Sequence, residues 1–266
     1  MEHAGEPASL ELTLMRLLRS LLFDVLMYAL MAVMGILCAP MALWSVDGAY
    51  RAIKAYCGAT FWLLRVICGL RVEVRGEVPT GDVIVVSKHQ SFLDIMILAY
   101  HLPRVRFIMK KQLRWAPILG LYALRIGSTP VDRGKKAKAM KAMVADVERD
   151  ATPHQLVIYP QGTRTLPGAK LPYKVGAGVL YERLGKTCVP AATNVGVFWA
   201  RRSRYRHPGL AVVEFLPPIE PGLRISDFMR RIEAVVEENS DRLMREAGFV
   251  LPAPEEPVPE AAPPRA

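Results

Sequence analysis

Residues 83–102 read VIVVSKHQSFLDIMILAYHL, and this stretch decides the fold that we expect. Its first four residues are apolar with no polar alternation, which is typical of a strand covered on both faces of a sheet. A polar interval at residues 87–91 separates this run from an apolar run of helical length. Open α/β sheets bind ligands where a strand opens into a helix, so this stretch predicts both an α/β fold and a site.

Further short apolar runs predict a mixed, mostly parallel sheet that is covered by helices and preceded by an N-terminal membrane-associated helical region. We expect the remaining strands at residues 106–109, 127–131, 156–159, 189–194 and 211–216. A last long helix is predicted over residues 225–247, with Ser226 or Asp227 near its cap and Gly248 as its stop.

The overall composition excludes a disordered protein, because 52% of the 266 residues are apolar and only 23% are charged. A formal net charge of +10 indicates an anionic partner, which is nucleic acid, anionic lipid or a phosphorylated substrate. The four cysteines form no CxxC pair, and the five histidines are scattered with no HExxH helix. We therefore expect reduced thiols facing the cytosol, no metal site and a mechanism without a cofactor.

The amino-terminal region carries a long uncharged stretch, VLMYALMAVMGILCAPMALWSV at residues 25–46. As a helix it would reach across about 30 Å of hydrocarbon, although Pro40 is expected to kink or end it. A signal peptide and a buried core helix are the alternatives, and three glutamates among the first eleven residues argue against the first. Residues 55–70 form a shorter apolar stretch that suits a helix lying in the membrane interface.

Basic residues follow the long stretch more often than they precede it, which predicts attachment to the inner membrane with the main domain facing the cytoplasm. We therefore divide the chain into a membrane-associated region at residues 1–70, an α/β domain at 71–251 and a disordered Pro-rich tail at 252–266. The basic run at residues 135–141 is interpreted as attracted to an anionic surface or to the phosphates of coenzyme A. The run at residues 201–206 is interpreted as a contact to membrane lipid, with a solvated face as the alternative.

The polar interval of the opening stretch places His89 five residues before Asp94. An imidazole is suited to act as a general base, and a carboxylate that holds one ring nitrogen leaves the other facing substrate. On a regular helix the two side chains would diverge by about 140°, so His89 has to lie in the turn before the helix. The same residues allow a structural interpretation, because Ser91-x-x-Asp94 fits a capping box.

Three further segments place a cation beside glycine, hydroxyl or backbone amide groups at the edges of apolar runs. They read KKQLRWAPILG at residues 110–120, STPVDR at 128–133 and YPQGTRT at 159–165. This combination suits a phosphate oxyanion. A solvated ion pair and a simple turn at Gly162 are the alternatives for each segment taken alone.

Taken together, these segments resemble the 1-acylglycerol-3-phosphate O-acyltransferases of the glycerolipid acyltransferase superfamily. The resemblance covers the region 70–200 and has four blocks in family order: His89 to Asp94, Lys110 to Arg133, YPQGTRT, and CVPA at residues 188–191. In the family the third block usually has Glu before Gly-Thr-Arg, whereas this chain has Gln161. The amide keeps the capacity for hydrogen bonding but loses the charge.

The resemblance implies that His89 acts as the base, that Asp94 supports it, and that the acceptor's phosphate is bound by Lys110, Arg133, Gly162, Thr163 and Arg164. It implies transfer of a fatty acyl chain from acyl-CoA or acyl-acyl-carrier protein to the sn-2 hydroxyl of 1-acyl-sn-glycerol 3-phosphate, giving phosphatidate for phospholipid biosynthesis. The expected partners are lysophosphatidate, the acyl donor and membrane lipids, and nucleic acid is not expected. Acylation of another lysolipid, such as lyso-ornithine lipid or lysophosphatidylglycerol, and anionic-lipid binding without catalysis are the alternatives.

Overall fold

One sheet with helices on both faces makes up the part of the chain that the computed structural model describes, residues 6–132, 144, 145, 147 and 152–252. Within these residues seven strands follow the order β1-β7-β6-β2-β5-β3-β4. The strands are β1 Leu70–Arg75, β2 Val83–Ser87, β3 Val105–Lys110, β4 Thr129–Val131, β5 Gln155–Ile158, β6 Cys188–Thr193 and β7 Gly209–Phe215. The helices are α1 Glu6–Leu37, α2 Ala39–Trp44, α3 Val46–Leu63, η1 Leu64–Cys68, α4 Leu93–His101, η2 Lys111–Trp115, α5 Leu119–Arg125, α7 Gly176–Leu184, α8 Val195–Phe198 and α9 Ile225–Glu246.

The sheet is mixed and mostly parallel, which confirms the predicted fold class. Central strand β2 pairs in parallel with β5 and β6, while β7 joins β6 in the antiparallel sense and carries β1 at the edge. The sequence pattern did not predict β1, because its residues LRVEVR alternate with charge and all but the first are at least partly exposed. Strand β4 begins at Thr129, two residues later than expected, because Gly127 adopts a positive φ of 80° in the turn that precedes it.

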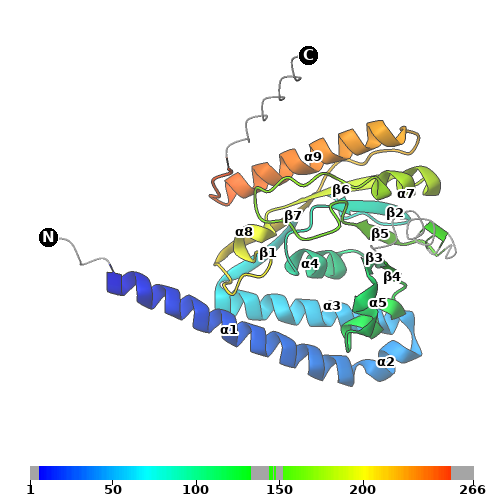
Figure 1. Ribbon diagram of the computed structural model, residues 1–266. Helices are drawn as coiled ribbons and strands as arrows, with labels where there is room; N and C mark the ends of the chain where they lie inside the picture. Colours follow the sequence, from blue (N-terminus) through cyan, green and yellow to red (C-terminus); the bar gives the residue numbers. More distant parts are fainter. Residues whose placement is uncertain (1–5, 133–143, 146, 148–151, 253–266) are drawn as a thin grey trace, which may run out of the picture.

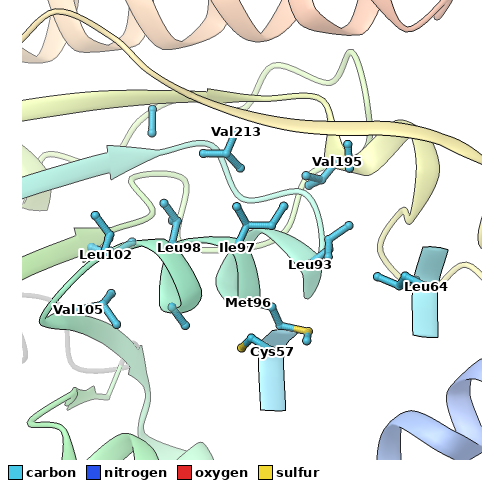
Figure 2. Close-up of a cluster of buried hydrophobic side chains, with 14 of the residues drawn as sticks. Cys57, Leu64, Leu93, Met96, Ile97, Leu98, Leu102, Val105, Val195 and Val213 are labelled. Atoms are coloured by element: carbon cyan, nitrogen blue, oxygen red, sulfur yellow. The ribbon is translucent and has the colours of Figure 1, made fainter. Parts of the chain in front are cut away.

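Helices lie on both faces of the sheet, with α7 and α9 on one side and α4, α3 and α1 on the other (Figure 1). Helix α4 is apolar nearly all round because it lies between the sheet and α3. Figure 2 shows Ile97 near Val213 of the sheet, while Met96 turns to the other side toward Cys57 of α3. This burial fixes the position of the loop in which α4 begins.

The uncharged amino-terminal stretch does not form one helix. Helix α1 ends at Leu37, and α2 begins at Ala39 with Pro40 in its first turn, where its missing N–H costs no hydrogen bond. The expected interruption at Pro40 is therefore confirmed, and the apolar run at 25–46 is divided between α1 and α2. By length and hydropathy, the one described helix that could cross a membrane is the part of α1 at residues 11–37.

Helix α1 also packs against the α/β domain through a polar contact. Its Asp24 accepts from Arg206 Nη2 at 2.6 Å, and its Ser20 Oγ accepts from the backbone N–H of Arg206 at 2.9 Å. Phe23 and Met27 of α1 are buried in the same apolar core as α4. The predicted interface stretch at 55–70 is helical up to Cys68, and it too lines this core, leaving side chains such as Trp62 and Val66 exposed.

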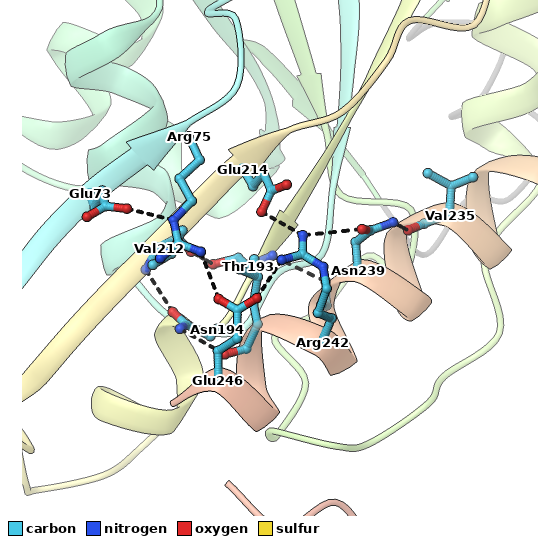
Figure 3. A network of polar contacts seen from close by, with 12 residues as sticks. Glu73, Arg75, Thr193, Asn194, Val212, Glu214, Val235, Asn239, Arg242 and Glu246 are labelled. Carbon is cyan, nitrogen blue, oxygen red and sulfur yellow. Dashed lines mark hydrogen bonds and ion pairs between the residues drawn. The ribbon is translucent and has the colours of Figure 1, made fainter. Parts of the chain in front are cut away.

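Helix α9 is tied to the β1–β7 edge of the sheet by a polar network (Figure 3). Arg75 of β1 contacts Glu246 at 2.7 Å, and Arg242 contacts Glu214 of β7 at 2.7 Å. The predicted helix bounds hold within one residue, and Gly248 follows its end with a φ of 78°. Arg224 is the N-cap residue, and Ser226 and Asp227 follow in the first turn, near the cap as predicted.

Candidate active site

The predicted site residues meet at one edge of the sheet because β2, β5, β3 and β4 are parallel neighbours. Parallel strands end at the same edge, so the loops after β2 and β5 and the end of β3 come together there. These positions hold His89, the YPQGTRT segment and Lys110, respectively. The first three blocks, far apart in sequence, therefore share one rim.

His89 lies in the loop between β2 and α4, and Asp94 is the second residue of α4. His89 Nδ1 and Asp94 Oδ1 are 2.8 Å apart. An ionised carboxylate only accepts hydrogen bonds, so this contact assigns the proton to Nδ1 and leaves Nε2 as the basic nitrogen. His89 therefore lies in the turn before α4, which is the position that its contact with Asp94 requires.

Asp94 also holds the loop before α4 with its second oxygen. Oδ2 accepts from the backbone N–H groups of Gln90 at 2.8 Å and Ser91 at 2.7 Å. Ser91 Oγ in turn accepts from the N–H of Leu93 at 3.2 Å. One half of the predicted capping box, the Ser91 N–H donating to Asp94, therefore holds together with the His–Asp contact, because the two carboxylate oxygens have different partners.

Tyr159 supports the imidazole in a way that the sequence pattern did not predict. Its ring stacks on His89 with centroids 4.1 Å apart and planes 20° apart. Burial, with a further contribution from the nearby Asp94 charge, raises the pKa of Tyr159 well above its usual range. In addition, Thr165 donates its N–H to the backbone oxygen of His89 at 2.7 Å. The third block thus holds the first block in place.

The QGTR loop has fewer free backbone donors than its sequence suggests. The N–H of Gly162 donates to the backbone carbonyl oxygen of Tyr159 at 2.9 Å, and the φ of 68° at Gly162 closes the turn. Gly162 therefore shapes the loop, because its N–H is already used within the turn. Thr163 and Arg164 remain at the surface of this loop, with the Arg164 side chain exposed.

Two cations join this loop from elsewhere in the chain. A Cβ placed on Gly162 would lie 2.8 Å from Lys174 Nζ, so that ammonium group lies directly over the glycine. Arg201 Nη1 donates to Thr163 Oγ1 at 3.3 Å and to the backbone carbonyl oxygen of Arg164 at 3.1 Å.

The predicted lipid-contact run at residues 201–206 is thereby corrected. Arg201 contacts the third block, and Arg206 is buried against α1, because both side chains find partners inside the protein. Arg202 and Arg204 remain exposed.

The remaining predicted residues have mixed outcomes. Lys110 ends β3 with an exposed side chain, and its neighbour Lys111 lies 4.0 Å from Asp132. Arg133 and the basic run at residues 135–141 lie outside the described residues, as does the tail from residue 253. The fourth block forms the start of β6, whose residues are all buried, so its contribution is packing.

An apolar cavity of about 140 Å³ lies beside the start of α4. Its wall includes Phe92, three residues after His89, and it extends along α4 as far as Ala99. Helices α1, α3 and α5 supply most of the remaining lining, including Met31, Ala52, Ile53 and Tyr122, and Phe107 of β3 also contributes. Among the described residues, no group of three or more His, Cys, Asp or Glu side chains is placed to hold a metal ion.

The chain is similar to several known proteins. A model of the acyltransferase family matches residues 70–211. The 1-acyl-sn-glycerol-3-phosphate acyltransferase of Pseudomonas aeruginosa is 27% identical over 230 residues, which cover 83% of this chain and 90% of that protein. The alpha form from Mus musculus is 34% identical over 158 residues, 57% of this chain and 55% of that protein, so the match spans about half of the mouse protein.

A solved structure has the same fold. The crystal structure of the 1-acyl-sn-glycerophosphate acyltransferase from Thermotoga maritima superposes with a TM-score of 0.73 at 18% sequence identity. The superposition covers 87% of this chain and 97% of that one.

Proposed function

The chain belongs to the acyltransferase family, and from this premise we propose that it acylates the sn-2 hydroxyl of 1-acyl-sn-glycerol 3-phosphate to give phosphatidate for phospholipid biosynthesis. The acyl donor is acyl-CoA or acyl-acyl-carrier protein. The observation that carries the proposal is the 2.8 Å contact between His89 and Asp94 at the rim of the sheet. Relatives named for this activity, one of them matched over 90% of its length, support the choice of acceptor.

In the proposed reaction, His89 Nε2 takes the proton from the acceptor's hydroxyl as its oxygen attacks the thioester carbonyl. The new ester bond forms, the carbon–sulfur bond breaks, and the thiolate leaves with the proton that the imidazole received. Asp94 and the stacked Tyr159 ring hold the imidazole in the orientation that this transfer needs. General-base assistance supplies roughly 10²- to 10⁴-fold, and the positioning of two bound substrates supplies much of the remainder.

The acceptor's phosphate would lie against the QGTR loop. We assign this contact to the Arg164 side chain and Thr163, with Gly162 shaping the turn and Lys110 at the end of β3. The resemblance adds Arg133, which lies outside the described residues. Lys174 and Arg201 add positive charge to the same loop. A cluster of guanidinium and ammonium groups stabilises a phosphate through charge-assisted hydrogen bonds.

The apolar cavity suits a fatty acyl chain. Phe92, three residues after His89, lines the cavity, so we assign this end of the cavity to the carboxyl end of the acyl chain. Burial of each methylene group stabilises binding by about 0.8 kcal/mol. No charged side chain lines the cavity, which is consistent with an alkyl occupant.

The molecule would bind to the cytoplasmic face of the inner membrane and remain on that face. Exposed apolar side chains cover the outer side of the amino-terminal helices, including Leu22, Val25, Ile36, Leu37, Trp44 and Trp62. Because Asp24 and Phe23 of α1 face the domain, only one side of that helix is left for lipid. A membrane surface at this position would supply the lipid acceptor to the rim.

A matrix of acyl donors and lysolipid acceptors with the purified protein in vesicles tests the proposal. We expect thiol release with lysophosphatidate to exceed that with monoacylglycerol, and His89→Ala to lower turnover at least about 10²-fold while the protein stays folded. A folded His89→Ala enzyme with normal turnover would refute the mechanism. Preference for lyso-ornithine lipid or lysophosphatidylglycerol would change the acceptor, and lipid binding without thiol release would refute catalysis.

A further inference from the structure

Lys88 carries a buried positive charge directly beside the proposed base. Its side chain is completely inaccessible to solvent, although it is adjacent in sequence to His89. Lys88 Nζ donates to Glu237 Oε2 of α9 at 2.7 Å. An unpaired buried ammonium is very costly, so this contact sets where the end of β2 lies relative to α9.

The other carboxylate oxygen of Glu237 forms hydrogen bonds with Gln161 of the third block and with Tyr173. Oε1 accepts from Gln161 Nε2 at 3.3 Å and from the Tyr173 hydroxyl at 3.1 Å. Burial, followed by the Glu237 charge, raises the pKa of Tyr173, so its hydroxyl keeps its proton and donates. One carboxylate thus joins the residue before His89 to the residue before Gly162.

Gln161 is neutral, and the structure gives a reason. Only its amide nitrogen can donate to Glu237, which fixes the orientation of the amide. A glutamate at this position would place a second carboxylate against Glu237 in a buried site that contains one ammonium group. The carboxylate next to Gln161 comes from α9, 76 residues further along the chain.

We propose that Glu237 is a positioning residue that fixes the His89 loop and the QGTR loop relative to each other by pairing Lys88 and binding Gln161. This inference rests on the proposed acyltransferase function. The buried cluster of Lys88, Gln161 and Glu237 tolerates one carboxylate, at position 161 or at position 237. It tolerates neither the loss of that carboxylate nor the addition of a second one. Glu233 lies nearby on the same helix, and its pKa is raised by burial and by the Glu237 charge, which is consistent with little room for more negative charge.

A charge exchange tests the proposal with four full-length proteins in vesicles: wild type, Gln161→Glu, Glu237→Gln, and the double variant. Turnover and the KM for lysophosphatidate are measured well below the lowest unfolding midpoint, with folding checked by circular dichroism. We expect each single variant to lower kcat about 10-fold or more, because an unbalanced buried charge displaces both loops. The double variant restores one carboxylate with the same number of atoms and is expected to recover most of kcat.

Glu238→Gln is the matched control, because it removes the same charge from an exposed position on the same helix. It should leave kcat and the unfolding midpoint unchanged. If Glu237→Gln fails to fold, Tyr173→Phe removes one hydrogen bond to Glu237 without changing the charge, and a severalfold lower kcat is expected. An unchanged kcat in folded Tyr173→Phe would then refute the positioning role.

Three results separate the possible failures. An inactive wild type would refute the proposed function itself. An active wild type with single variants that lose thermal stability but keep kcat would show a structural role only and overturn the proposal. Single variants that lose kcat without recovery in the double variant would overturn the charge balance.

Discussion

At the scale of single residues, Asp94 has two roles that the sequence presented as alternatives. One oxygen contacts the imidazole, and the other accepts two backbone N–H groups at the start of α4. Because both oxygens accept, an amide at this position cannot satisfy all three donors. This geometry argues against a mild effect of Asp94→Asn.

We therefore predict that Asp94→Asn lowers kcat at least about 10²-fold with little change in unfolding midpoint. The amide oxygen would stay with the two backbone donors, and its NH₂ group would face Nδ1, which forces the proton onto Nε2. Steady-state kinetics and thermal unfolding measure the two effects. Ser91→Ala is the control, since it removes a contact to Leu93 without touching His89 and should keep kcat. Asp94→Asn with near-normal turnover would contradict the assigned tautomer.

At the scale of elements, α4 connects the reacting end of the substrate to the apolar cavity. Phe92 and Ala99 both line that cavity, and seven helical residues separate them by about 10 Å. The depth available to an acyl chain is therefore set along this helix. The buried packing of α4 against the sheet and α3 keeps that depth constant.

Ala99→Leu should shift the donor preference toward shorter acyl chains. The added carbons would occupy the far end of the cavity, where only a long chain reaches. A series of acyl-CoA donors of increasing length provides the measurement, and the shortest donors act as the internal control. A uniform loss across all lengths would indicate damage to the fold, and an unchanged profile would exclude this cavity as the acyl site.

At the scale of the whole molecule, the amino-terminal helices and the α/β domain share one core. The buried side of α1 carries Phe23, Asp24 and Met27, and Asp24 pairs with Arg206, which is itself buried. The positive charge of the 201–206 run is thus partly used to attach α1. From Leu21 onward, the outward side of α1 carries exposed apolar side chains.

Arg206→Met should lower the unfolding midpoint by several degrees and expose the chain around residues 38–45 to proteolysis. The change leaves Asp24 as an unpaired, partly buried carboxylate, a loss of about 3–5 kcal/mol for a fully buried pair and less here. Limited proteolysis in vesicles and thermal unfolding test this, with exposed Arg204→Met as the control. Equal behaviour of the two variants would contradict the attachment.

The sequence alone determined the features that depend on neighbouring residues. The VIVV run, the His89–Asp94 spacing and the long last helix all follow from local periodicity, and Pro40 interrupts the apolar stretch because proline lacks an N–H. Strand β1 was not predicted from local periodicity, because its charged residues alternate with apolar ones. They are accommodated at the edge of the sheet next to β7.

Only the tertiary structure decided the contacts between distant segments. Lys88 and Glu237 are 149 positions apart, and Asp24 and Arg206 are 182 positions apart. No local pattern specifies such pairs, because they depend on which helix lies over which strand. The contacts of Gln161, Tyr159 and Arg201 in the site likewise join segments that are distant in the sequence.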